Sequence, residues 1–340
     1  MLTKKLGKLL KINTLLASVT VATVSFGLLT SPQVQASDYP NKPLNFVVGF
    51  GVGGSADRMT RSMTSFLADE LGEPIKVINK KGAGTQISAN YVLNRPGDGY
   101  TVLASTFAPY LSNTILKGNA SYSIEDFSFL NFQWFDMDLI AVNKDTPYQS
   151  LTEVLEKIRT EPKAVRASVV QGSAGHLMLR LLLEANNIPQ ENLALVTYNS
   201  GGKARSAVAG GQVDLVSISA QGSEGIREFL RPLAIVSEER SNKWDAPTIN
   251  EALKPLKVEV PVLPGSMRGF AVSTEFKQKY PERYKKLTLA IQNTLARKEV
   301  QKYLNKADIG GVWVGPEKSD QLMKQNFDTF KKYAYLLKND

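Results

Sequence analysis

The stretch Leu44-Asn45-Phe46-Val47-Val48-Gly49-Phe50-Gly51-Val52-Gly53-Gly54 decides the fold. Its first five residues form a short apolar run that predicts a β-strand, and its glycines predict a tight turn. Beyond the turn, Met59, Met63 and Phe66 recur at helical spacing, and Gly72 ends the predicted helix. A strand, a glycine turn and a helix in this order begin a parallel sheet with helices on its faces.

The same unit recurs along the chain. Further strands are predicted at 75–78, 100–104, 139–142, 167–170, 196–198, 213–216, 233–236 and 269–272. Helices are predicted at about 86–94, 151–158, 176–185, 203–209, 280–297 and 316–337, and Ser150 with Glu153 forms a capping-box pattern. The strand–helix pattern begins again after residue 139, and the chain returns to the first unit near its end. We therefore expect an α/β protein with mainly parallel sheets in two lobes around a ligand cleft. Lobe 1 would comprise 37–139 and about 263–340, and lobe 2 about 140–262.

The first 36 residues have the three parts of a secretory signal peptide. Four lysines precede an apolar stretch from Leu15 to Leu29, and Val34-Gln35-Ala36 is a cleavage pattern of the small-x-small type. A membrane anchor is the alternative, but the apolar stretch is short and contains four hydroxyl side chains. We therefore expect cleavage after Ala36 and export to the periplasm, or secretion.

Composition excludes several kinds of site. The 340 residues contain no Cys and one His, so a thiolate metal site, a cysteine nucleophile and a multi-His centre are not expected, and we predict no metal and no cofactor. Removing the leader lowers the net charge from +9 to +5, and the basic residues are scattered. Nucleic-acid binding is therefore not expected, whereas a modest positive charge suits a small anionic ligand.

Three glycine-rich turns point to that anion. They span residues 49–55, 171–175 and 199–202, and each follows a predicted strand and precedes a predicted helix. The backbone N–H groups at a helix N-terminus attract an anion. Three such turns facing one cleft could hold a carboxylate without a buried Arg or Lys.

Two catalytic interpretations compete with this one. Gly49-x-Gly51-x-x-Gly54 matches a dinucleotide-binding fingerprint, which would make the chain an oxidoreductase. That fingerprint needs an acid after the second strand, where this chain has Asn79-Lys80-Lys81. A hydrolase would need a nucleophile elbow, and Gln171 to Gly175 lacks its residue order. We therefore interpret the first turn as an anion-binding nest and predict no enzymatic activity.

Three side chains beside the turns have two interpretations each. Asp57 either complements the helix dipole or accepts a hydrogen bond from a ligand or water at the floor of the cleft. His176 either caps and packs the start of its helix or contacts the ligand. Tyr198 either lines the cleft or packs in the core.

Several motifs in order resemble the Bug (TctC-like) family, the substrate-binding receptors of tripartite tricarboxylate transporters. The resemblance covers essentially the whole chain after the leader. It rests on these blocks: Tyr39-Pro40-x-Lys42-Pro43, Phe50-x-x-Gly53-Gly54-x-x-Asp57-x-x-x-Arg61, Asn79-x-x-Gly82-Ala83-Gly84, Pro96-x-Asp98-Gly99-Tyr100-Thr101, Gly172-Ser173-x-x-His176-Leu177, Tyr198 with Gly201, and Gly210-Gly211-Gln212-Val213-Asp214.

The resemblance implies a periplasmic-binding-protein-like fold (type II) and a monomer that closes over a small carboxylate and presents it to membrane permease subunits. Such receptors hold the carboxylate largely through backbone N–H groups and waters. The matching positions here are Phe50, Gly53, Gly54, Ser55, Asp57, Thr106, Gly172, Ser173, His176, Tyr198, Ser200 and Gly201. A receptor that reports to a membrane signalling partner would fit the same motifs.

This chain departs from the family pattern within those loops. The Pro that usually precedes the first-loop Phe is Gly49, and the usual Arg-Pro pair is Lys80-Lys81. Val170 replaces a Gly, and Asn199-Ser200 replaces a Lys-Gly pair. These changes leave the ligand open among dicarboxylates or tricarboxylates, aromatic acids and amino acids.

Overall fold

A computed structural model describes residues 39–118 and 120–337, so the predicted leader and its cleavage site lie outside the described residues. The strands are β1 (Leu44–Val48), β2 (Ile75–Asn79), β3 (Thr101–Ala108), β4 (Phe127–Asp136), β5 (Asp138–Asn143), β6 (Arg166–Val170), β7 (Ala194–Tyr198), β8 (Leu215–Ser219), β9 (Leu230–Val236) and β10 (Ser266–Ser273). The helices are α1 (Ser55–Leu71), α2 (Gln86–Leu93), α3 (Tyr110–Leu116), α4 (Leu151–Thr160), α5 (Ala174–Ala185), α6 (Gly201–Ala209), α7 (Ile249–Leu253), α8 (Thr274–Lys279), α9 (Pro281–Ala296), α10 (Lys298–Lys306) and α11 (Gly315–Tyr333). Short 3₁₀ turns include η5 (Gln221–Phe229) and η7 (Ala334–Leu337).

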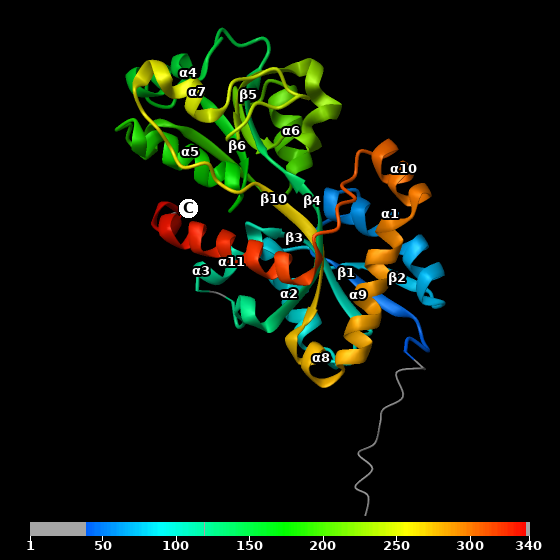
Figure 1. Cartoon of the computed structure of the whole chain (residues 1–340). Coiled ribbons are helices and arrows are strands. Elements are labelled where there is room, and N and C mark those ends of the chain that lie inside the picture. Colours follow the sequence, from blue (N-terminus) through cyan, green and yellow to red (C-terminus); the bar gives the residue numbers. More distant parts are fainter. Residues whose placement is uncertain (1–38, 119, 338–340) are drawn as a thin grey trace, which may run out of the picture. The chain divides into compact units, whose positions relative to one another are not determined.

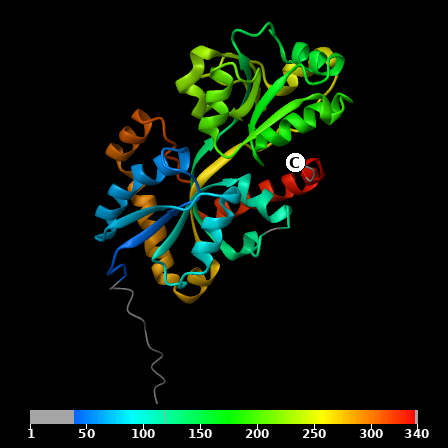
Figure 2. The same ribbon diagram turned by 180° about the vertical axis from the view of Figure 1, so that it is seen from behind.

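The first lobe is built on a five-stranded sheet in the order β2-β1-β3-β10-β4. β1 pairs in parallel with β2 and β3, and β10 lies antiparallel between β3 and β4. Helices α1 and α9 cover one face, and α2, α3 and α11 cover the other (Figures 1 and 2). Phe46 and Val48 pack in the core beneath α1 and α9, and Val47 packs in the core beneath α2, α3 and α11. Strand β1 is therefore buried on both faces, which explains its continuous apolar run.

The second lobe has a five-stranded sheet in the order β7-β6-β8-β5-β9. β6 pairs in parallel with β7 and β8, and β5 lies antiparallel between β8 and β9. Helices α4, α5 and α7 pack against one face and α6 packs against the other (Figure 1). Within the described residues, no helix is both long and apolar enough to cross a membrane.

Two crossings connect the sheets. Met137 alone separates β4 from β5, and the chain returns from β9 to β10 through residues 237–265. Ser266 at the start of β10 pairs with Asp136 at the end of β4, so the two crossing segments lie side by side. β10 therefore passes close to the connection between the lobes.

The predicted fold class, two α/β lobes, is confirmed, and both sheets are mixed. Their antiparallel pairings come from the crossing strands, whose partners lie far away in sequence. The sequence interpretation ended β3 at residue 104 and missed β4, α3, α7, α8 and α10. The lobe boundaries at about 139 and 263 stay a prediction. Phe330 and Leu337, near the end of the chain, pack into the core of the second lobe.

The predicted capping box of α4 is half formed. Ser150 Oγ accepts a hydrogen bond from the Glu153 amide at 3.2 Å, as expected. The Glu153 carboxylate accepts from the Gln149 amide at 2.8 Å instead of the Ser150 amide. Both side chains still satisfy free N–H groups at this helix start, one residue earlier than the pattern implies.

Candidate functional site

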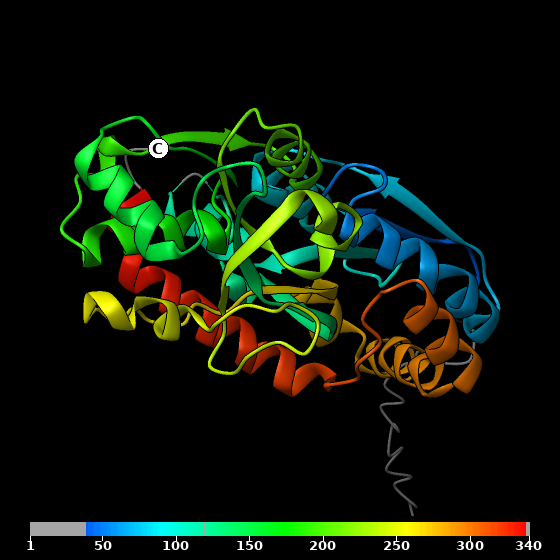
Figure 3. The same cartoon turned by 90° about the horizontal axis from the view of Figure 1, so that it is seen from above.

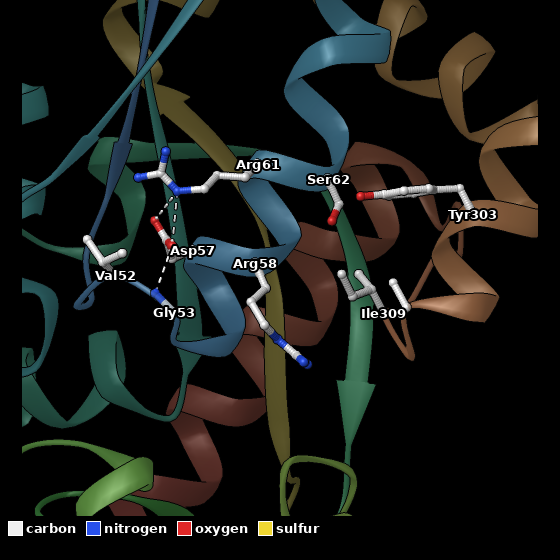
Figure 4. A pocket seen from close by; sticks show the side chains of 9 residues that line it. Val52, Gly53, Asp57, Arg58, Arg61, Ser62, Tyr303 and Ile309 are labelled. Atoms are coloured by element: carbon white, nitrogen blue, oxygen red, sulfur yellow. Dashed lines mark hydrogen bonds and ion pairs between the residues drawn. The ribbon is translucent and has the colours of Figure 1, made fainter. Parts of the chain in front are cut away.

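The turn after β1 is built around the carboxylate of Asp57. Gly53, in the left-handed region at φ +79°, donates its amide to Asp57 Oδ2 at 2.9 Å. Asn79 Nδ2 donates to Asp57 Oδ1 at 2.8 Å and to the Phe50 carbonyl at 3.0 Å. Arg61 Nε lies 3.0 Å from Asp57 Oδ1, and Figure 4 shows Arg61 and Gly53 converging on this carboxylate. Asp57 thus anchors the glycine turn to the helix and to the end of β2.

The same bonds set the ionisation of Asp57. Burial alone would raise the pKa of this carboxyl, but hydrogen bonds from Arg61, the Gly53 amide and Asn79 outweigh it and lower the pKa. Asp57 is therefore ionised at neutral pH, and its oxygens are engaged within the turn. A direct bond from Asp57 to a ligand stays a prediction.

Phe50 and the departure at Gly49 lie behind this turn. The Phe50 ring meets Tyr110 of α3 edge to face, with 5.1 Å between ring centroids. A Cβ atom at Gly49 would come within 2.7 Å of Ser105 Oγ and 2.8 Å of Ser88 Oγ. Since the space is filled by these two hydroxyl groups, this chain has no room for the side chain that the family pattern places there.

The second glycine turn joins β6 to α5. Gly172 has φ +69° and donates its amide to His176 Nδ1 at 3.2 Å. Ser173 caps α5, because its hydroxyl accepts the His176 amide at 3.1 Å. His176 is fully buried, so its contact with the turn fits the capping and packing interpretation. Asn113 of α3 donates to the Gly172 carbonyl, which connects this turn to the first lobe.

The third turn joins β7 to α6. Tyr198 is half-buried against the core between α6 and the sheet of the second lobe, and its carbonyl accepts the Gln171 amide at 3.0 Å. Ser200 is exposed and precedes α6 without a side-chain cap. A Cβ atom at Gly201 would lie 2.6 Å from Arg205 Nη1, so the guanidinium lies against this turn.

A cluster of charged side chains lies beside these turns, and we define it as Asp136, Asp138, Arg205 and Arg268. Arg205 is half-buried and the other three are buried. Arg268 Nε donates to Ser55 Oγ at 2.8 Å, and Arg268 Nη2 lies 3.4 Å from Asp136 Oδ2. Thr106 is the β3 partner of Arg268 in the sheet register. The sequence analysis therefore missed a buried Arg beside the first turn. Long-range pairing of β10 brings Arg268 to the turns, and the sequence pattern does not reveal that pairing.

The remaining members of the cluster connect to the second lobe. The amide of Gln221 donates to Asp136 Oδ1 at 3.0 Å. Arg205 Nη2 donates to the Ser219 hydroxyl at 3.0 Å, and Ser219 is the β8 partner of Asp138. The cluster therefore contains residues from both sheets and from α6.

Burial dominates the ionisation of the cluster. It raises the pKa of Asp138 to about 7, helped by the nearby Asp136 and opposed by Arg268 and Arg205. Burial also raises the pKa of Asp136, although Arg268 favours its charged form. The pKa of Arg205 falls to about 10, again because the group is buried. Asp138 is thus the member whose charge changes near neutral pH.

A pocket of about 420 Å³ opens on the first lobe beside the first turn, α1 and α10. Tyr303 of α10 meets Phe66 of α1 at 5.6 Å between ring centroids, and Figure 3 shows the two helices side by side. Figure 4 shows the side chains that line the pocket. The lining residues are Val52, Gly53, Asp57, Arg58, Arg61, Ser62, Tyr303, Ala307 and Ile309. Gly53 and Asp57 of the first turn line this pocket, and no residue of the second or third turn does.

Contacts link all three turns to one region. Ser55 of the first turn bonds to Arg268 of the cluster, and Gly172 of the second turn bonds to Asn113 of α3. The third turn contacts Arg205 of the cluster. The sequence interpretation missed Tyr110, Asn113 and the charged cluster. An available signal was the run Trp134-Phe135-Asp136-Met137-Asp138-Leu139, where two acids interrupt apolar strand residues. Among residues 39–118 and 120–337, no group of three or more His, Cys, Asp or Glu side chains could hold a metal ion.

We expect Asp138 to make the protein less stable as pH rises. Its pKa is raised from 3.8 to about 7, so between these values the folded state binds more protons than the unfolded chain, and the free energy of unfolding falls. The melting temperature should decline between pH 5 and pH 8, and Asp138→Asn should reduce that decline by about 3 °C or more. Differential scanning calorimetry at several pH values measures this.

Asp214→Asn is the matched control. Burial would raise the pKa of Asp214, but hydrogen bonds from Arg166 lower it, so its contribution is lost only in acid below about pH 4. Its profile between pH 5 and pH 8 should follow that of the unchanged protein. An equally steep decline in Asp138→Asn would contradict the buried, proton-binding state of Asp138.

Known proteins are similar to this chain in sequence and in fold. Residues 59–339 match the family described as the tripartite tricarboxylate transporter family receptor, TctC. BugT of Bordetella pertussis is 32% identical over 226 residues, which cover 64% of this chain and 68% of BugT. The periplasmic binding protein BugD has a TM-score of 0.70 at 25% identity, with 88% of this chain and 98% of BugD covered. MatC from Rhodopseudomonas palustris, solved with bound malate, has a TM-score of 0.73 at 22% identity, with 87% of this chain and 100% of MatC covered. The resemblance seen in the sequence is confirmed: the chain belongs to the tripartite tricarboxylate transporter receptor (TctC) family of periplasmic solute-binding proteins.

Proposed function

We propose that this protein is a periplasmic receptor that binds a small carboxylate between its lobes and delivers it to the permease subunits of a tripartite tricarboxylate transporter. The observation that carries the proposal is a set of three glycine turns, each at the carboxyl end of a strand. The first turn bonds to the buried Arg268, the second bonds to Asn113 of α3, and the third lies against Arg205. Ligands of open α/β sheets bind outside these strand ends. Family membership and the malate bound to MatC support the carboxylate class.

The chemistry of the turns suits an anion. The helices α1, α5 and α6 begin at the three turns, so their first N–H groups and their dipoles favour negative charge there. Arg268 adds a positive charge that is shielded from water. Closure of the lobes about Met137 would exclude water from the bound acid, as in other hinge-type receptors.

The single histidine supports a binding role over a catalytic one. His176 accepts the Gly172 amide through Nδ1, so in the neutral imidazole the proton is on Nε2 and neither nitrogen is available to remove a proton. A general base must have a nitrogen or oxygen available for the proton it removes. The receptor interpretation needs only that the turn keeps its shape.

A ligand screen tests the proposal. The protein, exported with its own leader and freed of co-purified ligand by unfolding and refolding, is titrated with succinate, malate, citrate, benzoate, nicotinate, amino acids, NAD and NADP. A ligand at a hundredfold excess over its Kd stabilises the folded form by about 2.7 kcal/mol, which thermal unfolding detects. We expect stabilisation by one class of acid and none by NAD or NADP. Stabilisation by NAD or NADP alone would overturn the proposal and favour the dinucleotide interpretation.

Gly54→Asp should weaken binding of the acid found in that screen about tenfold or more, because it adds a negative charge at the start of α1. Gly54 occupies the N-cap position of this helix, where Asp is a favoured residue, so the fold should remain stable. Isothermal titration calorimetry measures the affinity and thermal unfolding the stability.

Gly54→Ala separates charge from size. A Cβ atom there would lie 3.2 Å from the Gly51 carbonyl oxygen, a tight contact that both variants share. We expect the alanine variant to bind more tightly than the aspartate variant. Equal affinities for the two variants would mean that charge at this turn does not matter.

A further inference from the structure

We propose that Arg268 and Asp138 recognise opposite charges on one ligand, so that the receptor selects an amino acid over a plain carboxylate of the same length. This inference deepens the proposed function and rests on it. It starts from two buried atoms of opposite hydrogen-bonding character that have no partner among the described residues.

The first of these atoms is Arg268 Nη1. The side chain is 2% exposed, and its other nitrogens are engaged with Ser55 and Asp136, at 2.8 Å and 3.4 Å respectively. Nη1 has no acceptor within residues 39–118 and 120–337. A buried donor on a charged group is costly when it lacks an acceptor, and a carboxylate is the acceptor that a guanidinium binds most strongly.

The second atom is Asp138 Oδ2. Asp138 is 4% exposed, and Oδ2 receives no hydrogen bond in the described part of the chain. An ionised carboxylate only accepts hydrogen bonds, and an ammonium group only donates them. The group that best satisfies Asp138 is therefore a donor, and the strongest is a positively charged one.

Arg268 lies beside predicted site residues, and Asp138 is connected to one of them through Ser219 and Arg205. Arg268 bonds to Ser55 in the first turn and is the sheet partner of Thr106. Asp138 is the sheet partner of Ser219, which accepts a hydrogen bond from Arg205, and Arg205 lies against Gly201 in the third turn. A ligand held by these two turns would lie next to both unpaired atoms.

Charge balance then selects the ligand class. A ligand ammonium group beside Asp138 favours its ionised form. Two arginines and two aspartates then give the cluster no net charge. A ligand with one carboxylate and one ammonium group leaves this balance unchanged. A plain carboxylate adds negative charge beside two buried acids, and a dicarboxylate adds more, which is unfavourable where water is excluded.

The test compares acids that differ only in an ammonium group. Calorimetry on the exported protein measures Kd values for three pairs of acids: L-aspartate and succinate, L-glutamate and glutarate, and L-alanine and propionate. We expect at least one amino acid to bind about tenfold or more tightly than its partner acid. Asp138→Asn should weaken the binding of that amino acid about tenfold or more. The same change should leave the binding of the plain acid unchanged or make it tighter.

Two further variants complete the design. Arg268→Lys keeps the positive charge but removes the forked donors of the guanidinium, so it should weaken the binding of both acids of a pair. Asp214→Asn, which removes an ion pair to Arg166 outside the cluster, should change neither. If the asparagine variant of Asp138 fails to fold, Asp138→Ser is used in its place with the same expectation.

The outcomes separate this inference from the proposed function. Equal binding of amino acids and plain acids, unaffected by Asp138→Asn, would overturn the inference and leave a carboxylate receptor. If Asp138→Asn changes only the melting temperature, Asp138 is structural and the inference is wrong. If acids of neither kind bind, the proposed function itself fails.

Discussion

Gly269→Ala should destabilise the protein by roughly 3 kcal/mol, because the added methyl group has no space. Gly269 lies in β10 between β3 and β4, where the register shifts on the β4 side between Arg268 and Gly269. A Cβ atom at this position would lie 1.9 Å from the carbonyl oxygen of Asn131. Since that oxygen belongs to the backbone of the neighbouring strand, relief requires the two strands to separate.

The separation would affect the site as well as stability. Arg268 precedes Gly269 and reaches both Ser55 and Asp136, so a displaced β10 would move the guanidinium away from the first turn. We therefore expect weaker ligand binding together with a lower urea midpoint. Urea unfolding followed by circular dichroism measures the stability, and calorimetry measures the binding.

Gly202→Ala is the control for this substitution. Gly202 lies in the first turn of α6, and a Cβ atom there would meet nothing within 4 Å. Alanine favours a helix over glycine by about 0.5–1 kcal/mol, so stability should hold or rise slightly. Equal urea midpoints for the two variants would show that β10 and β4 tolerate a side chain at Gly269.

Asn131→Leu should cost about 3–5 kcal/mol, because it removes three buried hydrogen bonds at once. Asn131 is fully buried in β4, and its Nδ2 donates to the Val312 carbonyl at 2.9 Å. Its Oδ1 accepts the amides of Val314 and Gly315 at 2.9 Å and 3.0 Å. Leucine has a similar volume but no polar atoms, so the backbone groups that begin α11 would stay buried without partners.

The loss should first appear in α11. This helix packs on β3, β4 and α3, and its end enters the core of the second lobe through Phe330. We expect faster amide hydrogen exchange along α11 and a lower urea midpoint. Slow exchange in α11 with an unchanged midpoint would contradict the role of Asn131.

Asn90→Leu is the matched control. Asn90 lies in α2, and its Oδ1 accepts one hydrogen bond from Ser121 near the surface. Water can replace that partner, so the change in unfolding free energy should stay within about 0.5 kcal/mol. The difference between the two leucine variants therefore isolates the buried amide of Asn131.

Much of the fold could be predicted because its causes are local. The apolar run 44–48, the glycine turn after it and the helical spacing of Met59 and Met63 each act within a few residues, and all three form as expected. Gly72 ends α1 in the left-handed conformation at φ +75°, which glycine adopts without strain. The same local logic locates Ser173 as the cap of α5.

The candidate site could be predicted in part. The sequence located the glycine turns, and the contacts of Ser55, Gly172 and Gly201 connect them to one region. It did not reveal α3, whose Tyr110 and Asn113 contact the first and second turns. This seven-residue helix is too short for a periodic pattern to stand out, and its contacts with both turns are tertiary.

The sequence by itself determined the family, the two α/β units and the turns that favour an anion, since these depend on residue types at short spacing. Only the tertiary structure decided which charges are buried together. Asp136 and Arg268 are separated by 132 residues, and Asn131 forms a hydrogen bond with Val314, more than 180 residues away. The cause is the antiparallel insertion of β10 between β3 and β4, whose shifted register places Arg268 beside the first turn. A partner chosen by strand pairing across that distance leaves no local pattern, because the free energy that selects it comes from the assembled sheet.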